Sequence, residues 1–390
     1  MAPHAHGDGG GRVMRIVHWY PNFLGGGGVA NAVLGLATAQ AELGHDVIVA
    51  AAEAQNAPLY ERMDADGLQL VTFRERRRVQ RAGLRLRLIE RGDQDRLRAL
   101  APDAVHAHGE FNPDNLWAAR LFDAPLFLSP QGAFHPVVLR KSRALGKRAY
   151  MPVARRLLYS KLAAVHALSP DEARDVRSAL GDVAVYTVPQ GGNVRVRPAA
   201  PAARVDGPTR LISVGRLDVY TKGLDILLDA FAAARETVPV ELTVVGPDWN
   251  GGRAELERRA ASLGLNGSLR FTGPLAGTHV ADELQRADVY VQLSRHEGLP
   301  LAVTEALAAG KPAVLSSAIG TCSIPEVRRF RHVVVTEPTA DAASGALVDA
   351  ARSLETLRAA AAANADNVAQ LFSWRRIAGR HVERYAEAAC

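Results

Sequence analysis

Short apolar runs alternate with amphipathic stretches along the first half of the chain. The stretch at 28–44 repeats its apolar positions at helical spacing and ends at Gly44, which predicts a helix. The apolar runs predict strands at 13–19, 45–52, 68–73, 103–108, 124–129, 161–168 and 182–188. This alternation of strand and helix predicts a parallel sheet with helices on both faces.

The alternation starts afresh after 195–208, a segment rich in Pro and Ala that has the composition of a linker. Helices are predicted at 222–236, 252–264, 299–310 and after Asp341, and strands at 209–215, 240–246, 268–273, 288–294, 312–317 and 332–337. Two doubly wound domains in tandem predict a ligand site in the cleft between them, at the carboxyl ends of the strands.

Composition narrows the class of protein. Hydrophobic residues make up 48% and charged residues 23% of the 390 residues, which excludes a disordered chain. No apolar run is long enough to cross a bilayer. Two cysteines cannot build a disulfide framework, so a cytoplasmic protein is expected. Residues 1–13 are rich in His and Gly and lack the apolar stretch of a signal peptide, so a disordered tail is predicted there.

The net charge of +6 is unevenly spread, because residues 1–200 carry 26 basic and 19 acidic side chains while the remainder is nearly balanced. Two stretches, 74–98 and 140–161, hold much of the excess. Each is interpreted either as a solvated helix face or as a surface for an anionic membrane or an acidic acceptor. Nucleic acid is not expected as a partner, because aromatic residues are sparse there and no binding-module signature occurs.

Gly25–Gly28 follow the first predicted strand and begin the first helix. Glycines let the backbone approach a ligand, and the free N–H groups of a helix start attract anions, so this loop suits a diphosphate. Gly25, Gly27 and Ala30 also fit a G-x-G-x-x-A dinucleotide spacing, with Glu53 placed to hold a ribose. An NAD-dependent oxidoreductase is therefore one alternative, and a simple flexible turn is another.

Arg216 and Lys222 follow the first strand of the second domain, six residues apart. Two cations at a strand end suit a pyrophosphate, because a guanidinium binds as a fork and an ammonium as a point charge. The alternative is a surface pair that binds Asp218 or Asp225. The oxidoreductase hypothesis leaves both cations unexplained.

The most specific pattern is Glu297-Gly298-Leu299-Pro300 with Glu305 five residues further on. Pro300 marks a helix start, so the N–H groups of Gly298 and Leu299 are free to bind a ligand. Glu305 lies about 7.5 Å further along the helix axis, and two carboxylates at that offset suit hydroxyls on two sugar rings. A helix-capping role is the alternative for Glu297. It does not explain Glu305, a carboxylate on an otherwise apolar helix.

His106 and His108 lie two residues apart and therefore share a face of their strand. Core packing and a zinc pair are alternatives for them, but the sequence suggests no third ligand nearby. A polar catalytic role for His108 is the preferred hypothesis. The triplets Asp64–Asp66 and Asp93–Asp95 are interpreted as solvated, one before a strand and one in an Arg-rich helix, so no metal site is predicted.

The two glutamates with Gly298-Leu299-Pro300 between them resemble the signature of family 4 retaining glycosyltransferases. Arg216 with Lys222 resembles the phosphate-binding pair of that family, the glycines at 25–28 resemble its N-terminal loop, and 372–387 resembles its terminal helix. The resemblance runs from Met14 to the end. It implies an α/β fold called GT-B, in which two doubly wound Rossmann-like domains face each other across an interdomain cleft. The domains would be 14–200, joined by 373–390, and 201–372.

The resemblance also implies roles for individual residues. In the C-terminal domain, Glu305 would hold the ribose hydroxyls of the nucleotide sugar, and Glu297 would hold the 3- and 4-hydroxyls of the transferred sugar. Arg216 and Lys222 would stabilise the leaving diphosphate. The remaining implied contacts are the N–H groups of Gly298 and Leu299 on the sugar, Leu275 near the base, Gly26 and Gly27 near the phosphate or the acceptor, and His108 near the reacting bond.

Members of this family retain the anomeric configuration, by a front-face attack in which the leaving phosphate accepts the proton of the acceptor. Because Arg216 and Lys222 supply positive charge, neither a metal nor another cofactor is expected. The hypothesis is a cytoplasmic transferase that moves a hexose or N-acetylhexosamine from a nucleoside-diphosphate sugar, preferably a UDP-sugar, to a hydroxyl. The acceptor is either a lipid-linked saccharide at the inner membrane face or a soluble natural product. A nucleotide-sugar-binding protein without catalysis is the further alternative.

Overall fold

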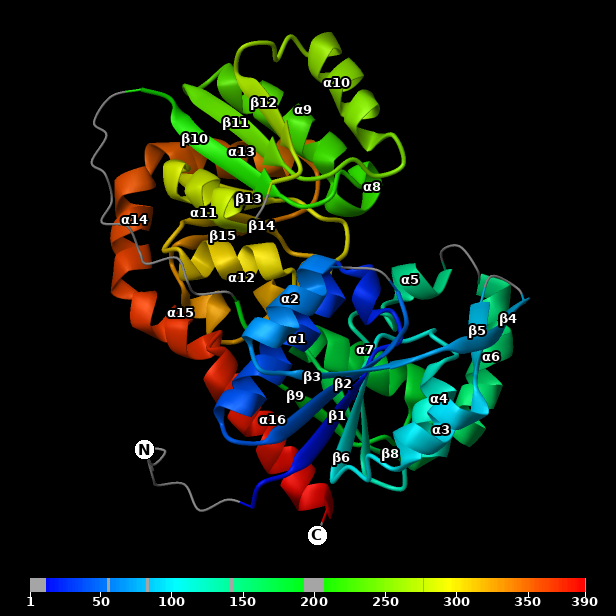
Figure 1. Ribbon diagram of the computed structural model, residues 1–390. Helices are drawn as coiled ribbons and strands as arrows, with labels where there is room; N and C mark the ends of the chain where they lie inside the picture. The colour runs from blue at the N-terminus through cyan, green and yellow to red at the C-terminus, as the bar shows by residue number, and fades with distance from the viewer. Residues whose placement is uncertain are drawn as a thin grey trace.

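The computed structural model describes residues 12–54, 57–81, 84–140, 144–192, 207–275 and 277–389. It contains two parallel sheets, each covered by helices, and in Figure 1 the C-terminal sheet lies above the N-terminal one. The predicted pair of doubly wound α/β units is therefore confirmed. Most of the predicted tail at 1–13 and of the predicted linker at 195–208 lies outside the described residues. Among the described helices, none combines the length and apolar character that a membrane span requires.

The N-terminal sheet has seven parallel strands in the order β3-β2-β1-β6-β7-β8-β9. Their bounds are β1 Arg15–Trp19, β2 Asp46–Ala52, β3 Gln69–Phe73, β6 Ala104–His108, β7 Leu126–Ser129, β8 Leu162–Ala167 and β9 Val185–Thr187. The strand order reverses between β1 and β6, which are paired along their length. In doubly wound sheets the ligand crevice opens at the carboxyl ends of the two strands where the order reverses. That position lies between the glycine loop and His108.

Seven helices accompany this sheet among the described residues. They are α1 Gly28–Glu42, α2 Ala57–Ala65, α3 Arg91–Arg98, α4 Asn115–Leu121, α5 Pro136–Arg140, α6 Ala144–Leu157 and α7 Pro170–Leu180. The N-terminal end of α7 is well defined, because Ser169 caps it by accepting a hydrogen bond from the backbone N–H of Glu172. The strands β6 and β7 are buried along their whole length, as expected for parallel strands covered on both faces.

The C-terminal sheet has six parallel strands in the order β12-β11-β10-β13-β14-β15. Their bounds are β10 Thr209–Val214, β11 Val240–Val245, β12 Leu269–Gly273, β13 Val289–Gln292, β14 Ala313–Ser316 and β15 Val333–Thr336. Its helices are α8 Val219–Lys222, α9 Leu224–Arg235, α10 Gly252–Ser262, α11 Gly277–Arg286, α12 Leu301–Ala308, α13 Ala340–Arg352, α14 Leu354–Ala363 and α15 Ala365–Leu371. Here the order reverses between β10 and β13, so Lys222 and Glu297 follow the two strands that flank this second crevice.

The last helix, α16 Trp374–Ala389, leaves the C-terminal sheet and packs against the N-terminal one (Figure 1). Ile377 and Tyr385 are buried in one apolar cluster with Ile16 and Phe127. The indole of Trp374 lies against Gly35 of α1 and against Gly191, where an added Cβ would come within 2.5 Å and 2.3 Å of it respectively. Both positions therefore need glycine, because a methyl group there would collide with the indole.

One predicted helix is wrong. The basic stretch at 74–98 forms an antiparallel hairpin, β4 Glu75–Arg81 with β5 Leu84–Ile89, before α3 begins. The sequence at 84–88 alternates Leu and Arg strictly, and a period of two is the signature of a strand rather than a helix. Asp93 is also not solvated, because it is buried and accepts a hydrogen bond from the backbone N–H of Arg74 at 2.7 Å.

Candidate active site

The glycine loop lies at the carboxyl end of β1, where a short 3₁₀ turn at Phe23–Gly25 separates the strand from α1. Gly26 and Gly27 have φ angles of +70° and +92°, a backbone conformation that favours glycine. A Cβ added at Gly25, Gly27 or Gly28 would meet no atom within 4 Å. Packing therefore does not demand these glycines, and the space beside them is open to a ligand.

The ammonium of Lys222 forms an ion pair with the carboxylate of Glu297. Lys222 ends α8, a short helix that Asp218 caps by accepting a hydrogen bond from the backbone N–H of Thr221 at 3.1 Å. Both charged side chains are largely but not fully buried. The structure thus brings together two of the predicted site residues from loops 75 positions apart.

Glu297 is also held from the protein side by a residue that the sequence analysis missed. The amide of Gln292, at the end of β13, donates to the second carboxylate oxygen of Glu297 at 3.0 Å. The hydroxyl of Tyr290 in turn donates to the amide oxygen of Gln292 at 2.5 Å. The only local signal was a single polar side chain in the apolar run of β13, which is weak.

Glu305 lies on α12, where it is half-buried and has no hydrogen-bond or ion-pair partner among the described residues. Burial raises its pKa to about 7. A carboxyl group buried without a partner loses the stabilisation that water gave it. Ligand hydroxyls donating to this carboxylate would restore that stabilisation.

The loop between Glu297 and α12 is fixed at its backbone. The N–H of Glu297 donates to the carbonyl of Ala318 at 3.3 Å, and the N–H of Gly320 donates to the carbonyl of Glu297 at 2.9 Å. Pro300 caps α12. The N–H groups of Gly298 and Leu299 donate to no backbone carbonyl within the described ranges, so they are available to a ligand.

Loops of the N-terminal domain contact this segment directly. A Cβ added at Gly132, after β7, would lie 3.6 Å from the backbone nitrogen of Gly298. The amide of Gln190 donates to the carbonyl of Leu299. The rings of His135 and His296 stack with their centroids 3.6 Å apart.

Arg216 does not join the Lys222–Glu297 pair in this structure. Its guanidinium lies 4.5 Å from the centre of the Trp249 ring, which follows β11, and 3.9 Å from the carboxylate of Asp218. The surface-pair alternative involving Asp218 is therefore partly seen. Leu275 follows β12 and packs against the apolar cluster that contains Leu299.

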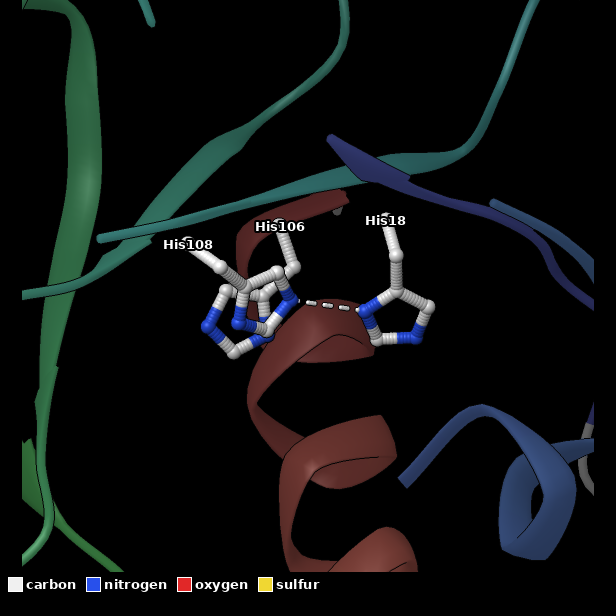
Figure 2. A group of neighbouring side chains, drawn as sticks. All are labelled: His18, His106 and His108. Carbon is white, nitrogen blue, oxygen red and sulfur yellow. Dashed lines mark hydrogen bonds between the residues drawn. The ribbon is translucent and has the colours of Figure 1, made fainter. Parts of the chain in front are cut away.

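His108 lies at the end of β6 among buried histidines (Figure 2). Its Nε2 lies 2.9 Å from Nδ1 of His18 on β1, and its own Nδ1 has no partner within the described part of the chain. Both nitrogens of His106 are occupied, at 2.5 Å from the hydroxyl of Tyr385 and 2.6 Å from that of Ser129.

The expectation that no third histidine lies near His106 and His108 is wrong, because His18 places a ring nitrogen within 4.8 Å of both. Adjacent parallel strands created this neighbour, and no local sequence pattern signals it. The nitrogens of His18 and His106 already have partners in the protein, since His18 Nε2 lies 2.7 Å from the side-chain oxygen of Gln40. Burial lowers the pKa of His18 to about 4 and that of His108 well below its usual value, so these rings are neutral near pH 7.

Comparisons with known proteins identify the family of both halves of the chain. Residues 199–368 match the family model "Glycosyl transferases group 1", and residues 27–191 match "Glycosyl transferase 4-like domain". The chain is 27% identical over 299 residues to a GDP-mannose:cellobiosyl-diphosphopolyprenol alpha-mannosyltransferase of Xanthomonas campestris, covering 73% of this chain and 74% of that one. It is 28% identical over 297 residues to a phosphatidyl-myo-inositol mannosyltransferase of Mycobacterium leprae, covering 74% of each.

Comparison with solved structures identifies the fold. Anabaena Alr3699/HepE, solved in complex with UDP and glucose, superimposes with a TM-score of 0.76 over 96% of this chain and 100% of that one, at 17% sequence identity. One family model covers the whole C-terminal sheet, and the other covers the N-terminal sheet except β1, so both halves of the molecule are matched. The chain therefore belongs to the group 1, family 4 glycosyltransferases and has their GT-B fold.

Proposed function

We propose that this glycosyltransferase moves a hexose from a nucleoside-diphosphate sugar to a hydroxyl, with retention of configuration and without a metal ion. The observation that carries the proposal is the Lys222–Glu297 ion pair together with Glu305 on α12, the helix that follows Glu297. Glu305 is a half-buried carboxyl group that lacks a partner among the described residues. Cation, sugar-binding carboxylate and ribose-binding carboxylate are the groups that such a donor requires.

Each group has a task in the proposed reaction. The diphosphate would bind to the ammonium of Lys222, which now pairs with Glu297. The guanidinium of Arg216 would turn away from Trp249 and bind the same diphosphate. The carboxylate of Glu297 would then accept hydrogen bonds from hydroxyls of the transferred sugar, while the hydrogen bond from Gln292 keeps it in position. Stabilising the charge that develops on the leaving diphosphate is the main contribution expected of such a site.

The N-terminal domain is proposed to hold the acceptor beside Gly26 and Gly27. His108 is kept neutral by burial, so its proposed contribution near the reacting bond is a hydrogen bond from a neutral imidazole rather than transfer of a proton. Deprotonation of the acceptor is assigned to the leaving phosphate. Leu275 is proposed to border the base.

The names of the sequence relatives favour mannose as the transferred sugar and GDP-mannose as the donor. The preference for a UDP-sugar that the sequence analysis stated stays a prediction. Both names also describe acceptors that carry a lipid, a diphosphopolyprenol in one case and a phosphatidyl-inositol in the other. We therefore propose a lipid-linked acceptor at a membrane surface in preference to a soluble one.

The test supplies the protein with radiolabelled GDP-mannose or UDP-glucose and a bacterial extract of lipid-linked saccharides, with EDTA present throughout. We expect label from GDP-mannose to enter the butanol-soluble product, and NMR of that product to show the anomeric configuration of the donor. Glu297→Gln serves as the inactive control. The proposal is overturned if neither donor is consumed faster in EDTA by the wild type than by the control. Consumption that appears only when Mg²⁺ replaces EDTA would refute the metal-independent part of the proposal.

A further inference from the structure

We propose that α6 and the β4–β5 hairpin form a docking surface for an anionic lipid bilayer. The surface is defined by Arg77 and Val79 on β4 and by Leu145, Val153, Arg156 and Leu157 on α6. The inference rests on the proposed function only in that a lipid-linked acceptor would be met at that bilayer.

Exposed apolar side chains are concentrated on this surface. Nine large hydrophobic side chains are exposed in the described part of the chain, and four of them are Val79, Leu145, Val153 and Leu157. Leu145 is 77% exposed, which is the largest value among them. Scattered single apolar residues are normal on a protein surface, but three on one helix of fourteen residues mark an interaction face.

The charge on the α6 part of this surface has a single sign, whereas the hairpin also carries Glu75, which pairs with Arg87. Between Asp123 and Asp171 the sequence has eight Lys or Arg residues and no Asp or Glu. On α6 itself Arg148, Arg155 and Arg156 are exposed, and on the hairpin Arg77 is exposed. Aliphatic side chains set among cations suit the boundary between anionic headgroups and acyl chains. A nucleic-acid surface would instead carry exposed aromatic side chains among the cations.

The inner side of this surface is anchored to the protein. Tyr150, Ala154 and Leu158 are buried in the N-terminal core, so α6 turns its remaining face outward. The hairpin is fixed to α4, because the indole of Trp117 donates to the carbonyl of Arg87 at 2.6 Å. Figure 1 places the hairpin and α6 at the same side of the N-terminal domain.

One side chain connects the surface with the glycine loop. The guanidinium of Arg87, on β5, pairs with Asp114 and donates to the side-chain oxygen of Asn22 at 2.8 Å. Asn22 immediately precedes the turn that leads to Gly26 and Gly27. The hydrogen bond between Arg87 and Asn22 therefore links the hairpin, where the bilayer would bind, to the loop proposed to receive the acceptor.

The experiment measures co-sedimentation of the full chain with vesicles of phosphatidylcholine, with and without phosphatidylglycerol. The test variant carries Leu145→Ser and Val153→Ser. The matched control is Val335→Ser, the same change at 46% exposure on β15 of the other domain, compared with 45% at Val153. The melting temperature of each variant confirms that it is folded.

We expect the wild type and the control to sediment with vesicles that contain phosphatidylglycerol and to be released as the salt concentration is raised. Neither should bind vesicles of pure phosphatidylcholine. The double variant should lose at least about fivefold in bound fraction. Equal binding of wild type and double variant, or absence of vesicle binding, would each overturn the proposal. Calorimetry with GDP and UDP on the same samples separates the two hypotheses, because nucleotide binding without vesicle binding refutes only this one.

Discussion

Glu305 is the single residue whose surroundings point most directly to a ligand. An apolar helix has no structural need for a half-buried carboxyl group, and its desolvation raises the pKa to about 7 from an ordinary value of 4.5. The folded state therefore binds this proton more tightly than the unfolded state does. Ionisation of this carboxyl group costs no stability below pH 4.5, where both states are protonated. The cost grows as the pH rises from 4.5 to about 7 and is constant above that, where both states are ionised.

Replacing Glu305 by Gln removes that cost, because the amide does not ionise. We expect Glu305→Gln to match the wild type near pH 4 and to exceed its free energy of unfolding at pH 8 by up to about 3 kcal/mol. Urea unfolding at the two pH values measures the difference. Parallel pH profiles for the two proteins would show that the carboxyl group is not desolvated.

Lys222 belongs to the phosphate half of the proposed site. Lys222→Ala should weaken binding of a nucleoside diphosphate by at least about tenfold, because it removes a charge-assisted contact. Binding of the corresponding nucleoside, which has no phosphate, should change little. Competition against a fluorescent nucleotide measures both ligands on the same protein. Equal losses for nucleoside and diphosphate would assign Lys222 to general stability.

At the scale of residues, the sequence pointed to several of the side chains on which the proposed function depends. Glu297, Lys222 and Glu305 could be predicted because each lies next to a helix start or on an apolar helix. Gln292 and His18 could not be predicted, because each acquires its role from a neighbour that only the folded chain supplies.

At the scale of elements, the attachment of α16 depends on glycines. Trp374 lies so close to Gly35 that an added Cβ would come within 2.5 Å of the indole, whereas a Cβ at Gly379, on α16 itself, would meet nothing within 4 Å. Both glycines lie inside helices, where alanine is intrinsically favoured by about 1 kcal/mol.

The two alanine substitutions should therefore have opposite signs. Gly35→Ala should destabilise the protein by about 1–3 kcal/mol through overpacking, and Gly379→Ala should be neutral or stabilising. Chemical denaturation of both variants gives the comparison. A stabilised Gly35→Ala variant would mean that the indole moves aside freely.

Regular alternation made most elements predictable, because buried parallel strands are short apolar runs with helices between them. The β4–β5 hairpin was missed for a physical reason. Arginines are as suitable on the polar face of a helix as on an exposed strand. Only the Leu–Arg alternation at 84–88 distinguishes the strand from the helix.

At the scale of the whole molecule, five buried histidines join β1, β6, β8 and α16. Ser129 lies 2.6 Å from both His106 and His166, and His381 of α16 lies 2.9 Å from the hydroxyl of Tyr186. Burial lowers the pKa of all five, to about 4 for His18 and His166. Their contribution to stability is complete above the unfolded pKa of 6.5 and is lost as the pH falls towards 4.

The folded protein should therefore lose stability as soon as the pH falls below 6.5. We expect the free energy of unfolding to fall between pH 6.5 and pH 4.5, where histidines of the unfolded chain take up protons. Burial raises the pKa of Glu110, Glu172 and Glu305 to about 7, which acts in the opposite direction but through fewer groups. Urea unfolding across this pH range measures the net effect of the histidines and the glutamates on the free energy of unfolding. A constant or rising free energy on acidification would contradict the neutral network.

The tandem GT-B fold was accessible from the sequence, but the contacts between the two domains were not. Gly132 against Gly298 and the stacked rings of His135 and His296 join residues more than 150 positions apart. No pattern along the chain encodes such pairs, because they depend on how two complete domains meet.

Calorimetric titration with GDP and UDP in EDTA tests the central claim, a metal-independent nucleoside-diphosphate site formed by Lys222, Glu297 and Glu305. We predict one bound nucleoside diphosphate per chain, with an affinity that Mg²⁺ does not improve. Binding should also tighten as the pH rises through 7, because ligand hydroxyls prefer the ionised form of Glu305. Binding that requires Mg²⁺, or no binding of either nucleotide, would contradict the account.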